Sequence, residues 1–336
     1  MSKRLEGRDE PILEADIAII DAHHHLFDRP NLRYLLDDFL EDAGLGHKIA
    51  ASVYIETQAM ARAAGPEHLR ALGEVEFANG QAAMAASGRY GDVRAAAAII
   101  GFAKVSDGDI VAELLDKSMA AAPDRYRGVR QMTFTHPNET LAKMIPNRMP
   151  DGILASDGFL AGFKHVASRG LSFEATVFHT QLGEVAALAD AFPDTTIILS
   201  HMGMAMGMGL DADARAEVFA EWRAAMIVLA QRSNVICKIG GLGMPFWGFG
   251  FESRADAPGF AELAAAWGPY IEAAIEAFGA DRCMMESNFP LEGVSCGFVP
   301  LWNAFKHVVR EYAPAEKAAL FHDTAARVYA IAAPAA

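Results

Sequence analysis

Short apolar runs alternate with amphipathic segments along the whole chain. Eight such runs occur, at residues 17–22, 49–55, 93–102, 126–132, 172–178, 195–200, 235–239 and 282–287. Runs of this length between amphipathic segments are typical of parallel strands joined by helical crossovers. Eight units in 336 residues fit a closed barrel better than an open sheet. We therefore predict an α/β fold in which residues 1–336 form a single domain, a (β/α)8 TIM barrel at about 16–312 with a C-terminal helix at 314–331.

The segments between the runs carry helical periodicity. Helices are expected at about residues 66–87, 106–121, 157–167, 182–192 and 259–278. Between the sixth and seventh runs, apolar side chains recur on one helical face, at Val218, Trp222, Met226 and Leu229. No Gly-x-Gly-x-x-Gly motif follows the first run, so the sequence lacks the main signature of a dinucleotide-binding fold.

Composition and charge narrow the classes of function. The formal net charge of −14 argues against nucleic acid or an anionic membrane as the partner. Three cysteines without a CxxC pattern indicate a reducing compartment and no disulfide framework. The N-terminus is charged and lacks an apolar signal region, and no stretch reaches the roughly 20 apolar residues of a membrane span. We expect a cytoplasmic protein that acts on a small molecule, as a monomer or a homo-oligomer.

Histidines follow three of the apolar runs. The first run ends at His23 and His25, the fifth at His179 and the sixth at His201. In a barrel of this kind the active site lies at the carboxyl ends of the strands. Because side chains alternate along a strand, His23 and His25 point to the same side and can converge on one metal ion or substrate. Strand ends also carry polar residues simply as caps, but four histidines at three strand ends fit an active site better.

Three further polar residues end other runs, Glu56 the second, Arg130 the fourth and Asn288 the eighth. An arginine at this face can bind a substrate carboxylate or a polarised carbonyl oxygen. Glu56 is expected to orient a histidine. Glu286 has the same parity as Asn288, and we expect it to form a structural ion pair with Lys238 below the site.

Together these motifs resemble the amidohydrolase superfamily, and most closely its amidohydrolase-2 branch, which includes 2-pyrone-4,6-dicarboxylate lactonase and sugar lactonases. The resemblance rests on the first-strand pair His23 and His25, the lone His179, the segment Leu199-Ser200-His201-Met202-Gly203 and the segment Glu286-Ser287-Asn288-Phe289-Pro290. It extends over roughly residues 16–329. The order and spacing of the four motifs are specific for family and fold, and not for substrate.

The resemblance implies roles for individual positions. The implied ligands of a divalent metal, zinc in the first instance, are His23, His25 and His179. The implied catalytic positions are Arg130, His201 and Asn288. A site without metal is also compatible with this family, and the pair of histidines would then contact the substrate.

Asn288 departs from the family pattern, in which an aspartate accepts a proton from the attacking water. An amide has no basic site near neutral pH. Either a metal such as zinc activates the water, or a histidine, His201 or His179, serves as the base. The missing carboxylate also removes a negative charge that would help to hold a dication.

Two loops suggest the nature of the substrate. Residues 202–208 are rich in Met and Gly, and residues 244–251 are rich in aromatic side chains. Such side chains make adaptable apolar walls, so Met204 and Trp247 are expected to contact substrate beside Glu56 and Arg130. A local packing cluster or an oligomer contact would have the same composition.

The expected activity is hydrolysis of a carboxylic ester or lactone by water, on an anionic or aromatic small molecule. Two alternatives remain open from the sequence. One is a metal-assisted decarboxylase on the same barrel, which needs no hydrolytic base. The other is a barrel that has lost its catalytic activity and only binds a ligand or a partner.

Overall fold

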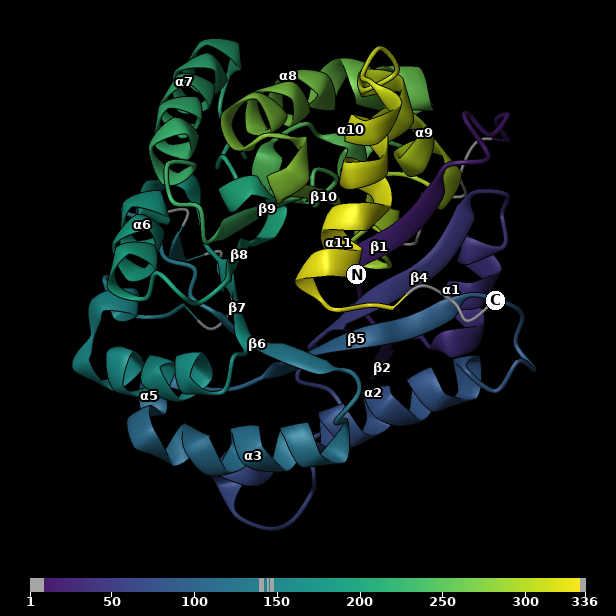
Figure 1. Ribbon diagram of the computed structural model, residues 1–336. Coiled ribbons are helices and arrows are strands. Elements are labelled where there is room, and N and C mark those ends of the chain that lie inside the picture. Colours follow the sequence, from purple (N-terminus) through teal and green to yellow (C-terminus); the bar gives the residue numbers. More distant parts are fainter. Residues whose placement is uncertain (1–8, 139–141, 144, 146–147, 333–336) are drawn as a thin grey trace.

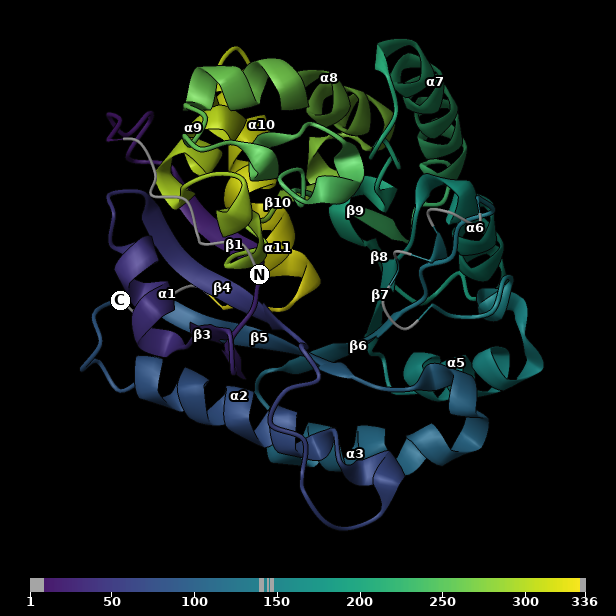
Figure 2. The same cartoon turned by 180° about the vertical axis from the view of Figure 1, so that it is seen from behind.

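The computed structural model describes residues 9–138, 142–143, 145 and 148–332. Eight parallel strands form one sheet that is ringed by helices, as Figure 1 shows from one side and Figure 2 from the other. The predicted (β/α)8 barrel is therefore confirmed. The N-terminal residues 1–8 and the last residues 333–336 of the predicted domain lie outside the described residues.

The strands of the barrel follow one another around the sheet in chain order. They are β1 (Ala18–His24), β4 (Lys48–Ile55), β5 (Arg94–Phe102), β6 (Tyr126–Met132), β7 (Ser172–Thr176), β8 (Ile197–Leu199), β9 (Val235–Ile239) and β10 (Cys283–Met285). Each coincides with one of the predicted apolar runs. This agreement follows from burial on both faces, which favours nearly continuous apolar strands in a parallel sheet.

The barrel closes where β1 meets the segment that follows β10. Phe289 forms a parallel bridge with His24 and its carbonyl accepts a hydrogen bond from the His25 amide at 2.8 Å. The amide of Asn288 donates to the carbonyl of His23, also at 2.8 Å. Closure therefore brings the first-strand histidines and the residues after the eighth barrel strand into direct contact.

Helices cover the outer face of the barrel (Figure 1). They are α1 (Leu36–Ala43), α2 (Leu72–Ala85), α3 (Val111–Ala121), α5 (Asp157–Ser168), α6 (Leu182–Ala191), α7 (Ala212–Leu229), α8 (Phe260–Phe278), α9 (Phe298–Val308), α10 (Pro314–Ala318) and α11 (Thr324–Val328). Side-chain caps begin two of them, because Ser156 accepts from the Phe159 amide and Asp211 accepts from the Ala214 amide. Within the described residues, no helix combines the length and apolar character needed to cross a membrane.

Two short strands were not predicted. A short antiparallel hairpin, β2 (Phe27–Arg29) and β3 (Leu32–Tyr34), follows the first barrel strand. The predicted C-terminal helix is present but broken, since a wider turn at Ala319–Asp323 separates α10 from α11. Tyr329, just past α11, is fully buried against the inner apolar side chains of the barrel. The C-terminal segment thus closes the end of the barrel opposite the histidines.

Candidate active site

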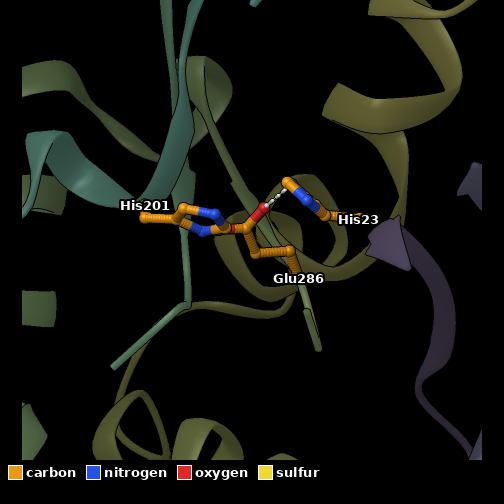
Figure 3. Close-up of side chains that lie close together, drawn as sticks. All are labelled: His23, His201 and Glu286. Carbon is orange, nitrogen blue, oxygen red and sulfur yellow. Dashed lines mark hydrogen bonds and ion pairs between the residues drawn. The ribbon is translucent and has the colours of Figure 1, made fainter. Parts of the chain in front are cut away.

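Polar side chains from widely separated strands meet inside the barrel at its carboxyl end. His23 belongs to β1, and His201 lies in the turn that follows β8. Glu286 comes directly after β10. Figure 3 shows Glu286 lying between the rings of His23 and His201. All three side chains are buried, so this contact is shielded from water.

Glu286 contacts both histidines through the same ring position. Its Oε1 lies 2.5 Å from Nδ1 of His201 and its Oε2 lies 2.9 Å from Nδ1 of His23. A carboxylate oxygen can only accept, so Glu286 Oε1 favours the tautomer of His201 with hydrogen on Nδ1, which leaves Nε2 of His201 as a base. Nδ1 of His23 also lies 3.5 Å from Nζ of Lys238, which can only donate, so Glu286 does not by itself fix the tautomer of His23.

The expected ion pair between Glu286 and Lys238 is wrong, because Lys238 pairs with a different glutamate. Lys238 Nζ lies 2.8 and 2.9 Å from the two oxygens of Glu174 on β7. Tyr329 donates to the same carboxylate at 2.7 Å. Burial lowers the pKa of Lys238, against the opposing influence of Glu174. A buried cluster of Lys238, Glu174 and Tyr329 therefore lies beneath the histidines. Glu286 does not take part in it and contacts the histidines instead.

The first-strand histidines converge as predicted. Nε2 of His23 lies 3.1 Å from Nε2 of His25. Nδ1 of His25 donates to the carbonyl of Ile55 at 2.9 Å, because a carbonyl can only accept. His24 points the other way, with Nδ1 at 3.0 Å from the carbonyl of Val53. Because Nδ1 of His25 carries its hydrogen, Nε2 of His25 is the acceptor in the contact with His23, and the two Nε2 atoms face each other at one position.

Both histidines of this pair are neutral at ordinary pH. Burial lowers the pKa of His23 well below its usual value, and the charge of Lys238 lowers it further. Burial also lowers the pKa of His25, with Arg130 as the next cause. Neutral imidazoles keep the lone pairs that a metal ion or a substrate hydroxyl would use.

The donor set fits a divalent metal ion. Metal-binding histidines generally donate their second N–H to a carboxylate or a carbonyl, as His25 does to Ile55, and Nδ1 of His23 lies 2.9 Å from Oε2 of Glu286. Within the described residues, His23, His201 and Glu286 form the group whose ligand atoms lie within 4.8 Å of one another. Because Glu286 already contacts both rings in that group, the facing Nε2 atoms of His23 and His25 suit an ion better.

Arg130 is fixed by a buried glutamate. Its Nε donates to Glu56 Oε1 at 2.7 Å and its Nη2 donates to the Glu56 carbonyl at 2.6 Å. Nη1 lies 3.4 Å from Nε2 of His23. Glu56 was expected to orient a histidine, and the structure shows that it orients the arginine. The guanidinium is thereby aimed at the position that the histidine pair faces.

Breaking the Arg130–Glu56 pair should be costly. Arg130→Met is expected to lower the free energy of unfolding by about 3–5 kcal/mol, since Glu56 would remain buried without its cation. In the double variant Arg130→Met/Glu56→Met most of that loss should be recovered, as no buried charge remains. Chemical denaturation of the single and double variants measures this. Losses that simply add in the double variant would contradict the interpretation.

Asn288 is held by a carboxylate that the sequence reasoning did not single out. Its Nδ2 donates to Glu292 Oε1 at 3.0 Å, and its buried Oδ1 has no hydrogen-bond partner among the described residues. Burial raises the pKa of Glu292 to about 8, with a contribution from Glu286. A glutamate four residues after Asn288, in an otherwise apolar segment, was the available signal. Glu292 fixes the amide so that its oxygen, and not its NH2, is left unpaired.

The backbone at the site adopts unusual conformations. His201 and Asn288 both have a φ of 52°, in the left-handed region that residues with a Cβ rarely adopt. Gly241, with a φ of 69°, faces the ring of His201, and a Cβ there would lie 2.5 Å from its Nδ1. The glycine is required so that the imidazole can reach Glu286.

This close approach gives a specific prediction. Gly241→Ala should lower kcat/KM about tenfold or more, because the new methyl group must displace the His201 ring. Gly250→Ala is the matched control, as its φ of 77° carries the same backbone strain but nothing lies within 4 Å of its Cβ position. Gly250→Ala should lose about 1 kcal/mol of stability, and Gly241→Ala more because of the contact with His201, as measured by denaturation. Equal activity losses would show that strain, and not the contact with His201, is responsible.

The remaining predicted residues lie in the loops around this centre. His179 begins a turn after β7, with Nδ1 3.4 Å from the Met206 amide and Nε2 3.9 Å from Glu221. It lies outside the group formed by His23, His201 and Glu286, so its role as a metal ligand stays a prediction. The carbonyl of Met204 accepts from the amide of His179 at 3.2 Å.

Trp247 packs against other aromatic side chains in the long loop after β9. Its ring lies 5.2 Å from Tyr270 and 6.4 Å from Phe249. Both Trp247 and Met204 are almost fully buried. Packing is therefore one role of this cluster, and a contact of either residue with substrate stays a prediction.

Comparison with known proteins agrees with this geometry. A protein of Sinorhizobium fredii named y4mH is 34% identical over an alignment of 339 positions. The alignment covers 94% of this chain and all of that protein. The L-fucono-1,5-lactonase of Burkholderia multivorans is 27% identical, over 94% of this chain and 97% of the lactonase.

A crystal structure of a Burkholderia multivorans amidohydrolase with bound zinc superposes with a TM-score of 0.70, at 22% identity, covering 93% of this chain and 99% of that one. The family model described as amidohydrolase matches residues 20–331, which include every strand end discussed above. The chain with the His23–Glu286–His201 arrangement therefore belongs to the amidohydrolase family.

Proposed function

We propose that this protein is a hydrolase that opens lactones or cleaves carboxylic esters by attack of water on the carbonyl carbon. The observation that carries the proposal is the buried contact of 2.5 Å between Glu286 Oε1 and His201 Nδ1. A carboxylate at Nδ1 orients an imidazole and leaves its Nε2 to accept a proton, as in other histidine-based hydrolases. The contact supports His201 as a base where Asn288 cannot act as one.

The other groups have complementary roles in this proposal. His201 Nε2 takes a proton from the attacking water. The unpaired Oδ1 of Asn288 accepts a hydrogen bond from the second hydrogen of that water and so orients it. Arg130, held by Glu56, stabilises the negative charge that develops on the carbonyl oxygen. The proton held by His201 then passes to the leaving oxygen, which becomes the hydroxyl of the product.

A divalent metal, zinc in the first instance, is part of the proposal. The facing Nε2 atoms of His23 and His25 would hold it, with His179 as the further ligand suggested by the sequence. When bound, such an ion lowers the pKa of a coordinated water and polarises a carbonyl. The zinc-bound relative from Burkholderia multivorans supports this assignment.

Metal content can be measured directly. Elemental analysis of the purified protein should find about one divalent ion per chain, and His23→Asn/His25→Asn should lower that content at least tenfold. His47→Asn removes a buried histidine far from the site and is the matched control. A wild-type protein that binds no zinc on dialysis against the ion would contradict the metal assignment. His23 and His25 would then contact the substrate itself.

The substrate class is suggested by the relatives and by the charge inside the site. The lactonase from Burkholderia multivorans acts, by its name, on a sugar lactone. The cation of Arg130 favours a carbonyl flanked by electron-rich oxygens or a carboxylate. We therefore propose five- and six-membered aldonolactones first, and aromatic lactones and esters second.

A substrate panel tests the proposal. Purified protein is incubated with aldonolactones, aryl esters and hydroxybenzoic acids, and release of protons is followed in parallel with release of CO₂. Proton release from a lactone or ester without CO₂ is the expected result. Release of CO₂ would support the decarboxylase alternative, which the missing carboxylate at Asn288 keeps open. Binding of a ligand without any turnover would support the alternative of a catalytically inactive barrel that only binds a ligand.

A further inference from the structure

A cavity lies outside the barrel wall, away from the histidine cluster. Its volume is about 460 Å³, and it lies between the loop that follows β4, the end of β5 and helices α2 and α3. Its apolar lining includes Phe102, Ile110, Val111 and Leu114. None of the residues that line it belongs to the active site described above. The volume is sufficient for a small organic molecule.

One carboxylate in this cavity has an oxygen without a partner. Glu74 Oε1 accepts hydrogen bonds from the hydroxyl of Tyr54 at 2.8 Å and from the amide and hydroxyl of Thr57. Its Oε2 has no hydrogen-bond partner among the described residues. The side chain is only 1% exposed, so bulk water does not satisfy this oxygen. A buried acceptor left in this way lacks a donor, which a water, an ion or a ligand in the cavity can supply.

The charges near the mouth of the cavity are largely balanced. Lys104 lies 2.8 Å from Asp107, and His68 lies 3.0 Å from Glu113. Two further exposed residues of opposite charge, Glu67 and Arg70, line the same cavity. These charges nearly cancel, so Glu74 is the unbalanced charge at the buried end. A positively charged group is the complement that this end lacks.

We propose that this cavity binds a small molecule with a primary ammonium group, which donates to Glu74 Oε2 while its apolar body lies against Phe102, Ile110 and Leu114. An ammonium group provides three donors on a compact charge, and a charged hydrogen bond of this kind is about twice as strong as a neutral one. The site is independent of the lactone chemistry proposed above.

The ionisation of Glu74 is consistent with such a partner. Burial and, after it, the negative charge of Glu56 raise the pKa of this carboxyl to about 7. A cation bound at Oε2 would offset both effects by stabilising the ionised form. At pH 8 the carboxyl is mostly ionised, so that pH is suited to the measurement.

Two matched probes separate the ammonium group from the apolar body. Isothermal titration calorimetry of the full chain at pH 8 compares 2-phenylethylamine with 2-phenylethanol, which has the same shape without the charge. The amine is expected to bind at least tenfold more tightly than the alcohol, a difference of about 1.4 kcal/mol. Equal affinities, or no binding of the amine up to about 10 mM, would overturn the proposal.

Glu74→Gln tests the carboxylate itself. The amide oxygen can keep the three hydrogen bonds from Tyr54 and Thr57, while the NH2 replaces the unpaired Oε2. We expect affinity for the amine to fall at least tenfold, with affinity for the alcohol changed by less than about twofold. Unchanged binding of the amine would overturn the assignment of Glu74.

A second variant serves if Glu74→Gln does not fold. Ile110 is 49% exposed and lines the cavity, so Ile110→Trp should fill the space without disturbing the core. Binding of the amine should weaken at least tenfold. Ile227→Trp on α7, at a position that is 46% exposed and outside the cavity, is the control and should bind as the wild type does. Equal binding by both tryptophan variants would place the amine elsewhere and overturn the proposal.

Discussion

His201→Asn is expected to lower kcat/KM for lactone hydrolysis about 10³-fold. The substitution removes Nε2, the proposed base, while the side chain keeps a group that can donate to Glu286. Asn288 cannot replace this base, because an amide has no basic site at neutral pH. The loss should appear mainly in kcat, since the imidazole acts on the reacting water and not on substrate affinity.

His47→Asn is the matched control for this prediction. His47 is also buried, and its Nδ1 lies 3.0 Å from Nζ of Lys306, which comes from α9. Its removal should cost stability and leave kcat nearly unchanged. Steady-state kinetics of both variants, with folding checked by circular dichroism, decide the question. A His201→Asn enzyme within about tenfold of wild type would exclude His201 as the base.

Glu286→Gln is expected to have the second largest effect, a loss of about 10²-fold in kcat/KM. The glutamine keeps one acceptor oxygen for the Nδ1–H of His201, but it removes the negative charge that contacts both rings. Without that charge both imidazoles are held less firmly in their orientation. Kinetics should therefore show a lower kcat, and elemental analysis a lower metal content where His23 is displaced.

Asp42→Asn separates this effect from the general cost of changing a buried carboxylate. Asp42 lies on α1, outside the barrel, where it is 5% exposed and accepts a hydrogen bond from Tyr34 at 2.7 Å. It should lose stability but keep its activity. Partial recovery by Glu286→Asp would further support a role for the negative charge. Activities of Glu286→Gln and Asp42→Asn that fall equally would contradict a specific role of Glu286.

Much of the fold was predictable because a parallel barrel buries both faces of its strands. Each predicted apolar run became a strand, and the residues at the strand ends came together because all eight strands point the same way. The hairpin at Phe27–Arg29 and Leu32–Tyr34 was missed. Its strands are too short to show a periodicity, so only contact with the rest of the fold defines them.

The pairing of charged side chains was harder to predict than their position. Lys238 and Glu286 lie on neighbouring strands, yet Lys238 pairs with Glu174, which projects from β7 toward the middle of the barrel. Strand order alone cannot distinguish partners that meet across a closed barrel. His179 was placed at a strand end, but β7 stops at Thr176 and the histidine begins a separate turn.

The interior of this barrel combines two layers with different tasks. The lower layer, Glu174 with Lys238 and Tyr329, satisfies its charges internally. In the upper layer Oδ1 of Asn288 is left without a partner among the described residues, and the Nε2 atoms of His23 and His25 face each other at 3.1 Å. Buried polar groups with unsatisfied positions are where substrates and ions gain affinity, so the upper layer is the place for chemistry.

Hydrolysis in water enriched in ¹⁸O tests the central claim most directly. Attack of water on the carbonyl carbon places one ¹⁸O atom in the carboxylate of the hydroxy acid, while the hydroxyl keeps the ring oxygen of the lactone. Mass spectrometry of the product, with fragmentation to locate the label, should find ¹⁸O in the carboxylate, at a rate that falls about 10³-fold in His201→Asn. Label in the hydroxyl group, or release of CO₂ without incorporation of water oxygen into a carboxylate, would contradict the proposed mechanism.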